Sequence, residues 1–300
     1  ISRENGEKSR SCTMFIPVLL QRFGEAIVPL PGGDKIGARP LERHYDGLRK
    51  MGAKIEITDG VLRASIASPE KRLIGCRYRF EKNTHTGTET LLMASVKAKG
   101  QTVLENSALE PEVDNLIDFL NRMGAKIERN GREIVIDGVE ELSGSEIMTI
   151  PDRNEAVAFA CMALGTKGDV RIENVQIDHL SAFMEKLKEI GAGIEIFDDS
   201  FRPYFQEELR ATHVDTMPYP GFMTDWQSVW TALMTQTVGE SIVNERVFDS
   251  RFGYVSMLTK MGAKIELFNP EVANPEAYYN FNFADDKPTN FHSAKIIGPT

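Results

Sequence analysis

The chain has 300 residues, of which 41% are hydrophobic and 26% charged, and its formal net charge is −9. These values are ordinary for a globular protein and leave room for two domains, each with its own core. The negative charge argues against non-specific nucleic-acid binding, and no apolar run reaches the ~18 residues that a membrane span requires. We therefore expect a globular protein that binds neither nucleic acid nor a membrane.

The two ends of the sequence favour a fragment of a longer protein. The first ten residues, ISRENGEKSR, are polar, do not resemble a signal peptide, and are expected to be poorly ordered. The chain starts with Ile1 instead of Met and ends shortly after an apolar run that begins near Ala294. We interpret that run as the start of a fifth structural module. Because modules would be missing, we expect the 300-residue chain to be inactive alone.

The three cysteines, Cys12, Cys76 and Cys161, do not have the spacing of metal ligands, and two of them lie in apolar runs. This usage is typical of reduced core cysteines in a cytoplasmic protein. The sequence therefore predicts no metal site, and it contains none of the common nucleotide-loop or cofactor motifs.

One amphipathic unit occurs four times along the chain. Residues 112–128 carry apolar side chains with helical spacing at Val113, Leu116, Ile117, Leu120 and Met123, followed by a glycine and a short strand-like segment. The glycine suits the left-handed end of a helix. The four copies are LRKMGAKIEI, LNRMGAKIER, LKEIGAGIEI and LTKMGAKIEL, with glycines at Gly52, Gly124, Gly191 and Gly262. Each copy is expected to belong to a complete βα module.

A second set of segments repeats in step with the first. Apolar runs end in Gly24, Gly100, Gly168 and Gly239, and each glycine precedes a strand-like segment. The runs 14–20, 91–96 and 156–164 are apolar on nearly every face, so we expect helices that are buried on all sides. Placing such helices inside and the sheets outside gives an inside-out α/β barrel. An ordinary doubly wound sheet is the alternative.

The chain order of these segments predicts two domains. The modules cover residues 11–60, 87–139, 151–197 and 224–267, and the strand-rich connections are 61–86, 198–223 and 268–300. The boundary is expected at Ile150-Pro151-Asp152, which gives domains 1–150 and 151–300 with two modules each. Asp152 followed by Glu155 resembles a capping box for the buried helix.

Function is expected where the copies depart from one another. In the first module, PLPGGDKIGARPLERH places Asp34 at the tip of a glycine loop and Arg39 before the next helix, an arrangement that favours a phosphate or carboxylate. A solvated β-turn with a surface Arg is the alternative interpretation. In the fourth module, PYPGFMTDWQ offers Asp225 as a base, although Thr224 or Asp225 could simply cap the next helix.

Two further segments could contact an anion. Arg10 precedes the first apolar helix, and KNTHTGTE offers hydroxyl groups and backbone amides around Gly87. The first could equally be a solvated surface arginine, and the second an ordinary helix N-terminus.

Several of these segments together resemble a known enzyme family. PGGDKIGARP, ENSALEPEVDNLIDFLNRMGAKI, PDRNEA, and PGFMTDWQ followed by VFDSRFGYVSML are similar to the UDP-N-acetylglucosamine 1-carboxyvinyltransferases of peptidoglycan synthesis. The resemblance runs from Arg10 to Leu267. It implies an inside-out barrel of six modules in two domains, without a cofactor. It also implies transfer of enolpyruvyl from phosphoenolpyruvate to the 3′-hydroxyl of UDP-N-acetylglucosamine. The sister family, which makes 5-enolpyruvylshikimate 3-phosphate, does not show the PGG-x-x-IGARP loop.

The resemblance also implies roles for individual residues. Asp34 matches a position where the family usually has a cysteine that acts as general acid, and Asp225 matches the carboxylate that takes the hydroxyl proton. An epoxide antibiotic alkylates the family's loop thiol, so an aspartate there implies insensitivity to it. Arg39 resembles a catalytic arginine that contacts anionic groups. The implied substrate-binding residues are Arg10, Arg39, Pro40, Leu41, Glu42, Arg43, Thr84, His85, Thr86, Asp225 and Val247.

The chain also departs from the family pattern. Pro17 replaces a usual glycine, Leu109 replaces a usual arginine, and the 82–87 loop has one extra residue. The family's N-terminal Lys-Asn pair and the arginines of its last modules lie outside this chain. These departures leave two alternatives: an enolpyruvyl transferase with a 3-phosphoshikimate acceptor, and a degenerate homologue without catalysis.

Overall fold

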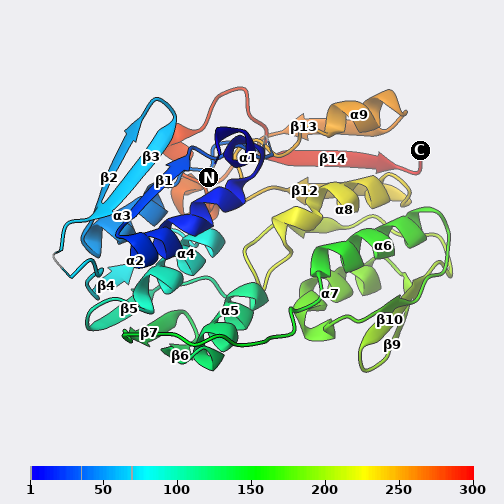
Figure 1. Cartoon of the computed structure of the whole chain (residues 1–300). Coiled ribbons are helices and arrows are strands. Elements are labelled where there is room, and N and C mark those ends of the chain that lie inside the picture. Colours follow the sequence, from blue (N-terminus) through cyan, green and yellow to red (C-terminus); the bar gives the residue numbers. More distant parts are fainter. Residues whose placement is uncertain (1, 35, 69) are drawn as a thin grey trace. The chain divides into compact units, whose positions relative to one another are not determined.

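The structure is a computed structural model, and it describes residues 2–34, 36–68 and 70–300 (Figure 1). Internal contacts divide these residues into two units. Unit 1 contains the described residues of 2–34 and 40–149, and unit 2 contains 36–39 and 150–300. The short segment 36–39 therefore packs with unit 2, although residues of unit 1 flank it in sequence.

The polar N-terminus forms a helix, so the expectation of a poorly ordered start is wrong. Helix α1 covers Arg3–Lys8, and the Ser2 hydroxyl caps it by accepting a hydrogen bond from the Asn5 amide. A 3-10 turn, η1, follows at Arg10–Met14. Capping and i,i+4 ion pairs such as Arg3–Glu7 supply the local stabilisation that a hydropathy pattern does not reveal.

Unit 1 contains two modules with the same element order of helix, strand, helix, strand, strand. The first module consists of α2 (Phe15–Phe23), β1 (Glu25–Pro29), α3 (Glu42–Lys50), β2 (Ala53–Thr58) and β3 (Val61–Ile66). The second consists of α4 (His85–Ser95), β5 (Gln101–Glu105), α5 (Pro111–Arg122), β6 (Lys126–Asn130) and β7 (Glu133–Asp137), with the edge strand β4 (Arg77–Arg79) before it.

Unit 2 repeats this order twice. The third module consists of α6 (Arg153–Gly165), β8 (Ile172–Glu173), the 3-10 turn η2 (Ile177–Leu180), α7 (Ser181–Glu189), β9 (Gly193–Ile196) and β10 (Ser200–Tyr204). The fourth consists of the 3-10 turn η3 (Thr224–Trp226), α8 (Gln227–Met234), β12 (Gly239–Asn244), α9 (Val255–Lys260), β13 (Lys264–Phe268) and β14 (Ser293–Gly298). Strand β11 (His213–Asp215) precedes it, and α10 (Pro275–Tyr278) and the 3-10 turn η4 (Phe283–Asp285) lie between β13 and β14.

The four sheets share one topology. Their strand orders are β1-β3-β2, β4-β5-β7-β6, β8-β10-β9 and β11-β12-β14-β13. In each sheet the last strand of the module pairs antiparallel with both others, and β4 and β11 add a parallel edge. A doubly wound fold requires a mostly parallel sheet, so that alternative is wrong.

The C-terminal strand corrects one sequence-based expectation. Residues near Ala294 were expected to start a fifth module, but β14 is the central strand of the fourth, between β12 and β13. A long connection containing α10 and η4 separates β13 from β14. In the first two modules the central strand follows the previous strand after a short turn. The long connection before β14 departs from this pattern, so the sequence did not show that β14 belongs to the fourth module.

The apolar helices are only partly enclosed. Helix α4 packs against both α2 and α3, and its Leu91, Leu92 and Ala94 are buried. In contrast, Phe15 and Val18 of α2 and Phe159 and Met162 of α6 are exposed. The expectation of burial on all sides is therefore wrong for α2 and α6. Each of these two helices packs through one side onto its sheet and its partner helix, α4 or α8, and the remaining side faces outward.

The repeated glycine after each outer helix has a left-handed backbone. Gly52, Gly124, Gly191 and Gly262 all have positive φ, between +83° and +107°. At Gly262 no atom lies within 4 Å of the position that a Cβ would occupy, so conformation and not space requires glycine there.

Gly262→Ala is therefore expected to destabilise unit 2 by roughly 1–2 kcal/mol, the cost of a left-handed non-glycine residue. Gly253→Ala is the matched control, since Gly253 also has open space but no positive φ. Urea unfolding followed by tryptophan fluorescence measures both, because the two tryptophans, Trp226 and Trp230, are buried in unit 2. Equal stability of the two variants would contradict the conformational explanation.

Candidate functional site

The residues of the glycine loop after β1 belong to two units: those up to Asp34 pack with unit 1, and 36–39 pack with unit 2. Asp34 is exposed at the end of the unit 1 segment. The preceding glycine run packs on helix α1: the Gly32 amide donates to the Gly6 carbonyl, and a Cβ on Gly32 would overlap the Glu7 carbonyl oxygen at 1.6 Å. The glycines therefore serve close backbone packing, and Asp34 remains accessible at the end of that packed segment.

A buried carboxylate in unit 2 holds the segment that follows. The Ala38 amide donates to Asp249 Oδ1 at 2.8 Å, and Asp249 is 6% exposed. Gly37 has a φ of +113°, and a Cβ there would lie 1.8 Å from the same oxygen. This contact fixes the backbone just before Arg39, which is half-buried. Sequence reasoning did not identify Asp249, which lies 211 residues from Ala38.

Asp225 lies in η3 and forms an ion pair. Its Oδ1 is 2.7 Å from Arg251 Nη2, and the carboxylate is 48% exposed while the Arg251 side chain is 12% exposed. Neither Thr224 nor Asp225 makes a side-chain capping hydrogen bond to η3 or α8, so the capping interpretation is wrong. The Thr224 hydroxyl is instead 2.9 Å from both carboxylate oxygens of Glu245. A charge-assisted hydrogen bond to a buried carboxylate is stronger than an ordinary cap.

Glu245 is a buried carboxyl group in contact with this turn. It has no exposed surface, and its Oε1 accepts hydrogen bonds from the Val247 and Phe248 amides at 2.9 and 3.0 Å. Burial raises the pKa of Glu245 to about 7, although the Arg251 charge and these hydrogen bonds oppose the shift. Val247, expected as a substrate contact, is thus held at its backbone by Glu245. The sequence offered no signal for Glu245, because one glutamate after a strand is usually solvated.

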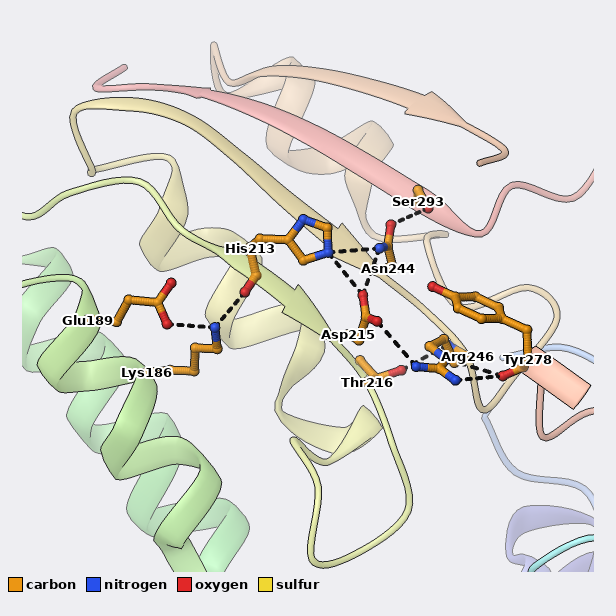
Figure 2. A network of polar contacts seen from close by, with 9 residues as sticks. All are labelled: Lys186, Glu189, His213, Asp215, Thr216, Asn244, Arg246, Tyr278 and Ser293. Atoms are coloured by element: carbon orange, nitrogen blue, oxygen red, sulfur yellow. Dashed lines mark hydrogen bonds and ion pairs between the residues drawn. The ribbon is translucent and has the colours of Figure 1, made fainter. Parts of the chain in front are cut away.

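A polar network anchors the end of the same strand, β12 (Figure 2). Asn244 Nδ2 donates to Asp215 Oδ1 at 2.7 Å, and Arg246 Nη1 donates to Asp215 Oδ2 at 3.2 Å. The Arg246 guanidinium also lies 3.8 Å from the Tyr278 ring centroid. Burial acts to raise the pKa of Asp215, but hydrogen bonds from Asn244 and His213 and the nearby positive charges hold it below its usual value. Residues 244–246 are therefore rigidly placed.

The remaining predicted residues gather in unit 1 around His44. Its Nε2 is 3.0 Å from the Thr86 hydroxyl, and the Arg43 guanidinium donates to the Asn83 carbonyl at 3.4 Å. Burial, together with the positive charges of Arg10 and Arg43, lowers the pKa of His44 to about 3. His44 is therefore neutral at pH 7, so Arg10 and Arg43 supply the positive charge of this cluster.

The helix starts on both sides of His44 place the other predicted contacts. Pro40 is exposed, and the buried Leu41 accepts hydrogen bonds at its carbonyl from the His44 and Tyr45 amides, so that α3 begins at Glu42. Thr84 caps α4 by accepting a hydrogen bond from the Gly87 amide at 3.3 Å.

His85, the first residue of α4, lies beside a carboxylate. Burial opposes protonation of His85, but Glu89 at 3.3 Å and other nearby carboxylates together raise its pKa.

The structure thus forms two groups of candidate residues, one in each unit. Unit 1 brings together Arg10, the 40–43 turn and the 84–86 helix start, and it also contains Asp34. Unit 2 contains Arg39, Asp225 and Val247 with the newly identified Glu245, Asp249 and Arg251. Among residues 2–34, 36–68 and 70–300, no three His, Cys, Asp or Glu side chains are arranged to hold a metal ion. No helix in these ranges is long and apolar enough to cross a membrane.

The raised pKa of Glu245 predicts a pH-dependent stability. The ordinary value for an unfolded glutamate is 4.5 and the folded value is about 7, so the folded chain binds more protons between these pH values. The stability contributed by this protonation is complete below pH 4.5 and is lost as the pH rises through 7. Glu245→Gln cannot titrate. The wild type should therefore lose stability relative to the Glu245→Gln variant as the pH rises. The difference in their free energies of unfolding should change by about 3 kcal/mol from pH 4 to pH 8.

Urea unfolding followed by tryptophan fluorescence measures this difference in unit 2. A difference that stays constant with pH would mean that Glu245 titrates at its ordinary value in the folded chain.

Comparison with known proteins identifies the family. Residues 10–285 match the model of the EPSP synthase (3-phosphoshikimate 1-carboxyvinyltransferase) family. UDP-N-acetylglucosamine 1-carboxyvinyltransferase 2 of Prochlorococcus marinus is 42% identical over 268 residues, which are 89% of this chain and 63% of the relative. The UDP-N-acetylglucosamine 1-carboxyvinyltransferase of Coxiella burnetii is 44% identical over 260 residues, 86% of this chain and 59% of the relative. The chain thus spans about 60% of the length of these relatives.

Solved structures agree on the fold. The enolpyruvyl transferase NikO from Streptomyces tendae superimposes with a TM-score of 0.76 at 21% identity, covering 94% of this chain and 62% of NikO. EPSP synthase from Acinetobacter baumannii gives a TM-score of 0.65 at 20% identity, covering 98% of this chain and 64% of that chain. The repeated modules therefore have the enolpyruvyl transferase fold, as the sequence predicted. Since the family model matches most of the chain, this protein belongs to the EPSP synthase (3-phosphoshikimate 1-carboxyvinyltransferase) family.

Proposed function

We propose that the protein to which this chain belongs transfers the enolpyruvyl group of phosphoenolpyruvate to the 3′-hydroxyl of UDP-N-acetylglucosamine. The observation that carries the proposal is the 42–44% identity to curated proteins named for this activity, over most of the chain. The activity would belong to cell-wall synthesis in the cytoplasm, where both substrates are available, and it would require no cofactor.

The two residue groups support distinct roles in this reaction. In unit 2, Asp225 is partly exposed and held by Arg251 at 2.7 Å, so its carboxylate can accept the proton of the attacking hydroxyl group. In unit 1, Arg10 and Arg43 supply positive charge beside the Thr84 and Thr86 hydroxyls, a combination that suits the diphosphate of a sugar nucleotide. Arg39 is assigned to the anionic groups of phosphoenolpyruvate.

The proposed chemistry needs one base and one acid. Asp225 removes the hydroxyl proton as the oxygen bonds to the substituted carbon of the enolpyruvyl double bond. The methylene carbon takes a proton from the acid, for which Asp34 is the candidate. Loss of phosphate from the adduct and of a methyl proton then restores the double bond.

The acceptor is the point on which the candidate functions differ. A 3-phosphoshikimate acceptor is favoured only by the name of the family model and by structural neighbours at 20% identity, which establish the fold alone. A degenerate homologue is suggested by Leu109, which replaces the usual arginine of the resembling family. Identity above 40% to the sugar-nucleotide enzymes favours UDP-N-acetylglucosamine over both alternatives.

Phosphate release measures the proposed activity directly. The assay uses the 300-residue chain and, in parallel, a graft in which its 260 matching residues replace the corresponding 59% of the Coxiella burnetii relative. Phosphate should appear in the graft only with phosphoenolpyruvate plus UDP-N-acetylglucosamine. Release with shikimate 3-phosphate would identify the other acceptor, and nucleotide binding without release would identify the degenerate homologue.

Asp225→Asn should lower kcat of the graft by roughly 10²–10⁴-fold, the usual cost of losing a general base. Asparagine keeps the size of the side chain and an oxygen that can still accept from Arg251, so nucleotide binding should change little. Asp198→Asn, which alters an exposed carboxylate in the same unit, is the control. Activity within about tenfold of the wild type would exclude Asp225 as the base.

Asp34 should make the enzyme insensitive to the epoxide antibiotic, since a carboxylate is a much weaker nucleophile than a thiolate. Asp34→Cys should keep activity and become covalently inactivated, which intact mass and residual activity measure together. Background labelling should be low, because burial raises the pKa of the Cys12, Cys76 and Cys161 thiols. Asp34→Ser is the control. Alkylation of the wild type at this loop, or a resistant Cys variant, would remove Asp34 from the site.

A further inference from the structure

Three groups from two segments of the chain donate hydrogen bonds to the Glu245 carboxyl group. It is fully buried in unit 2, and its two oxygens accept from the Thr224 hydroxyl while Oε1 also accepts from two backbone amides. Burying a carboxylate is costly even when it is paired, and a well-packed apolar residue often gives equal or greater stability. A role in placing neighbouring groups therefore explains this residue better than a role in packing.

The two groups that Glu245 contacts come from separate segments. Thr224 immediately precedes Asp225 in η3, whereas Val247 and Phe248 form the turn after β12. The charge of Arg251, the ion-pair partner of Asp225, is also close enough to affect the Glu245 pKa. One carboxylate thus links the Asp225 turn, the Val247 turn and the arginine that holds Asp225.

The direction of the Glu245 side chain is fixed by its neighbours. Asn244 and Arg246 are both bound to Asp215 in the network of Figure 2. The Arg246 amide also donates to the Thr216 hydroxyl at 2.9 Å. Anchoring the residue on either side leaves Glu245 little freedom to turn away from Thr224. The carboxylate is therefore preorganised and does not depend on a substrate to order it.

We propose that Glu245 is a positioning residue with two contacts. Its hydrogen bond with Thr224 positions the Asp225 carboxylate, and its hydrogen bond with the Val247 amide positions the Val247 backbone. This role rests on the proposed function, in which Asp225 is the base and Val247 contacts the nucleotide. The link does not depend on the charge of Glu245. A neutral side chain can still accept both amides on one oxygen and donate from the other atom to the Thr224 hydroxyl, which can also accept.

Three variants separate the two contacts of Glu245, here called the Asp225 arm (through Thr224) and the Val247 arm (through the backbone amides). Glu245→Ala removes both arms, Thr224→Val removes only the Asp225 arm, and Glu245→Gln keeps an acceptor for the amides and a donor for Thr224. Thr237→Val is the matched control, because Thr237 is also a buried threonine and donates to the Met234 carbonyl at the opposite end of α8.

The first measurements use the 300-residue chain and need no activity. Hydrogen exchange of the Val247 and Phe248 amides should become about tenfold or more faster in Glu245→Ala and be restored by Glu245→Gln. The side-chain carboxyl resonance of Asp225 in 13C-labelled chain should move in Thr224→Val and stay in place in Thr237→Val. Unchanged exchange in Glu245→Ala, or an unmoved Asp225 resonance in Thr224→Val, would overturn the proposal.

Kinetics in the grafted enzyme then test the consequence for catalysis. Thr224→Val should lower kcat by roughly 10–10²-fold with little change in KM for UDP-N-acetylglucosamine, because it displaces only the base. Glu245→Ala should lower kcat and raise that KM, and Glu245→Gln should recover most of both. Equal losses in the Gln and Ala variants would show that charge, not position, matters. If the grafted wild type shows no turnover, the proposed function is refuted but the positioning role of Glu245 is not. That role is still tested by hydrogen exchange of the Val247 and Phe248 amides and by the Asp225 carboxyl resonance.

Discussion

The fold depends on one strand in each module, the last in sequence, which pairs antiparallel with both other strands. Every backbone hydrogen bond of the basic three-stranded sheet passes through this central strand. The strand before it must therefore leave its outer helix in the right direction, and the left-handed glycine at each helix end makes that turn possible. The same constraint operates four times, which explains why the glycine recurs in the sequence.

The candidate site lies where this repeated pattern is interrupted. In the fourth module, the turn after β12 carries Glu245 and Asp249, both of them buried. The repeat itself has no need of buried carboxylates, because its core is formed by apolar residues in two separate clusters, one for each unit. These carboxylates instead hold backbone and hydroxyl groups: Asp249 holds segment 36–39, and Glu245 holds the Asp225 turn. Rigid polar anchoring of this kind is what the proposed base, Asp225, requires.

The fold, the family and the acceptor substrate are supported by different observations. Structural neighbours at about 20% identity establish the enolpyruvyl transferase fold, and the family model establishes membership. The acceptor is a finer question, and the sugar nucleotide proposed above rests on relatives that are 42–44% identical to this chain. The cluster around His44 is consistent with that acceptor, because its charge comes from Arg10 and Arg43 and not from the neutral histidine.

Local patterns in the sequence were sufficient for the modular architecture. Helical spacing identified α5, whose Val113, Ile117 and Leu120 are buried, and the repeated glycines predicted the left-handed helix ends. Asp152 was also correctly identified as a cap, since its carboxylate accepts from the Asn154 amide. These features depend on residues within one or two helical turns, so their physical causes are visible in a short window of sequence.

Other features were decided only by the tertiary structure. Helices α2 and α6 looked fully buried but expose one side, and the strand near Ala294 belongs to the fourth sheet, not to a new module. The roles of Glu245, Asp249 and Arg251 were also invisible, because their partners are distant in sequence: 211 residues separate Ala38 from Asp249. Thr224 looked like a helix cap because that role needs only a local amide. Folding instead placed the buried Glu245 carboxyl group beside the Thr224 hydroxyl, and the hydrogen bond between them determines where the Thr224 side chain points.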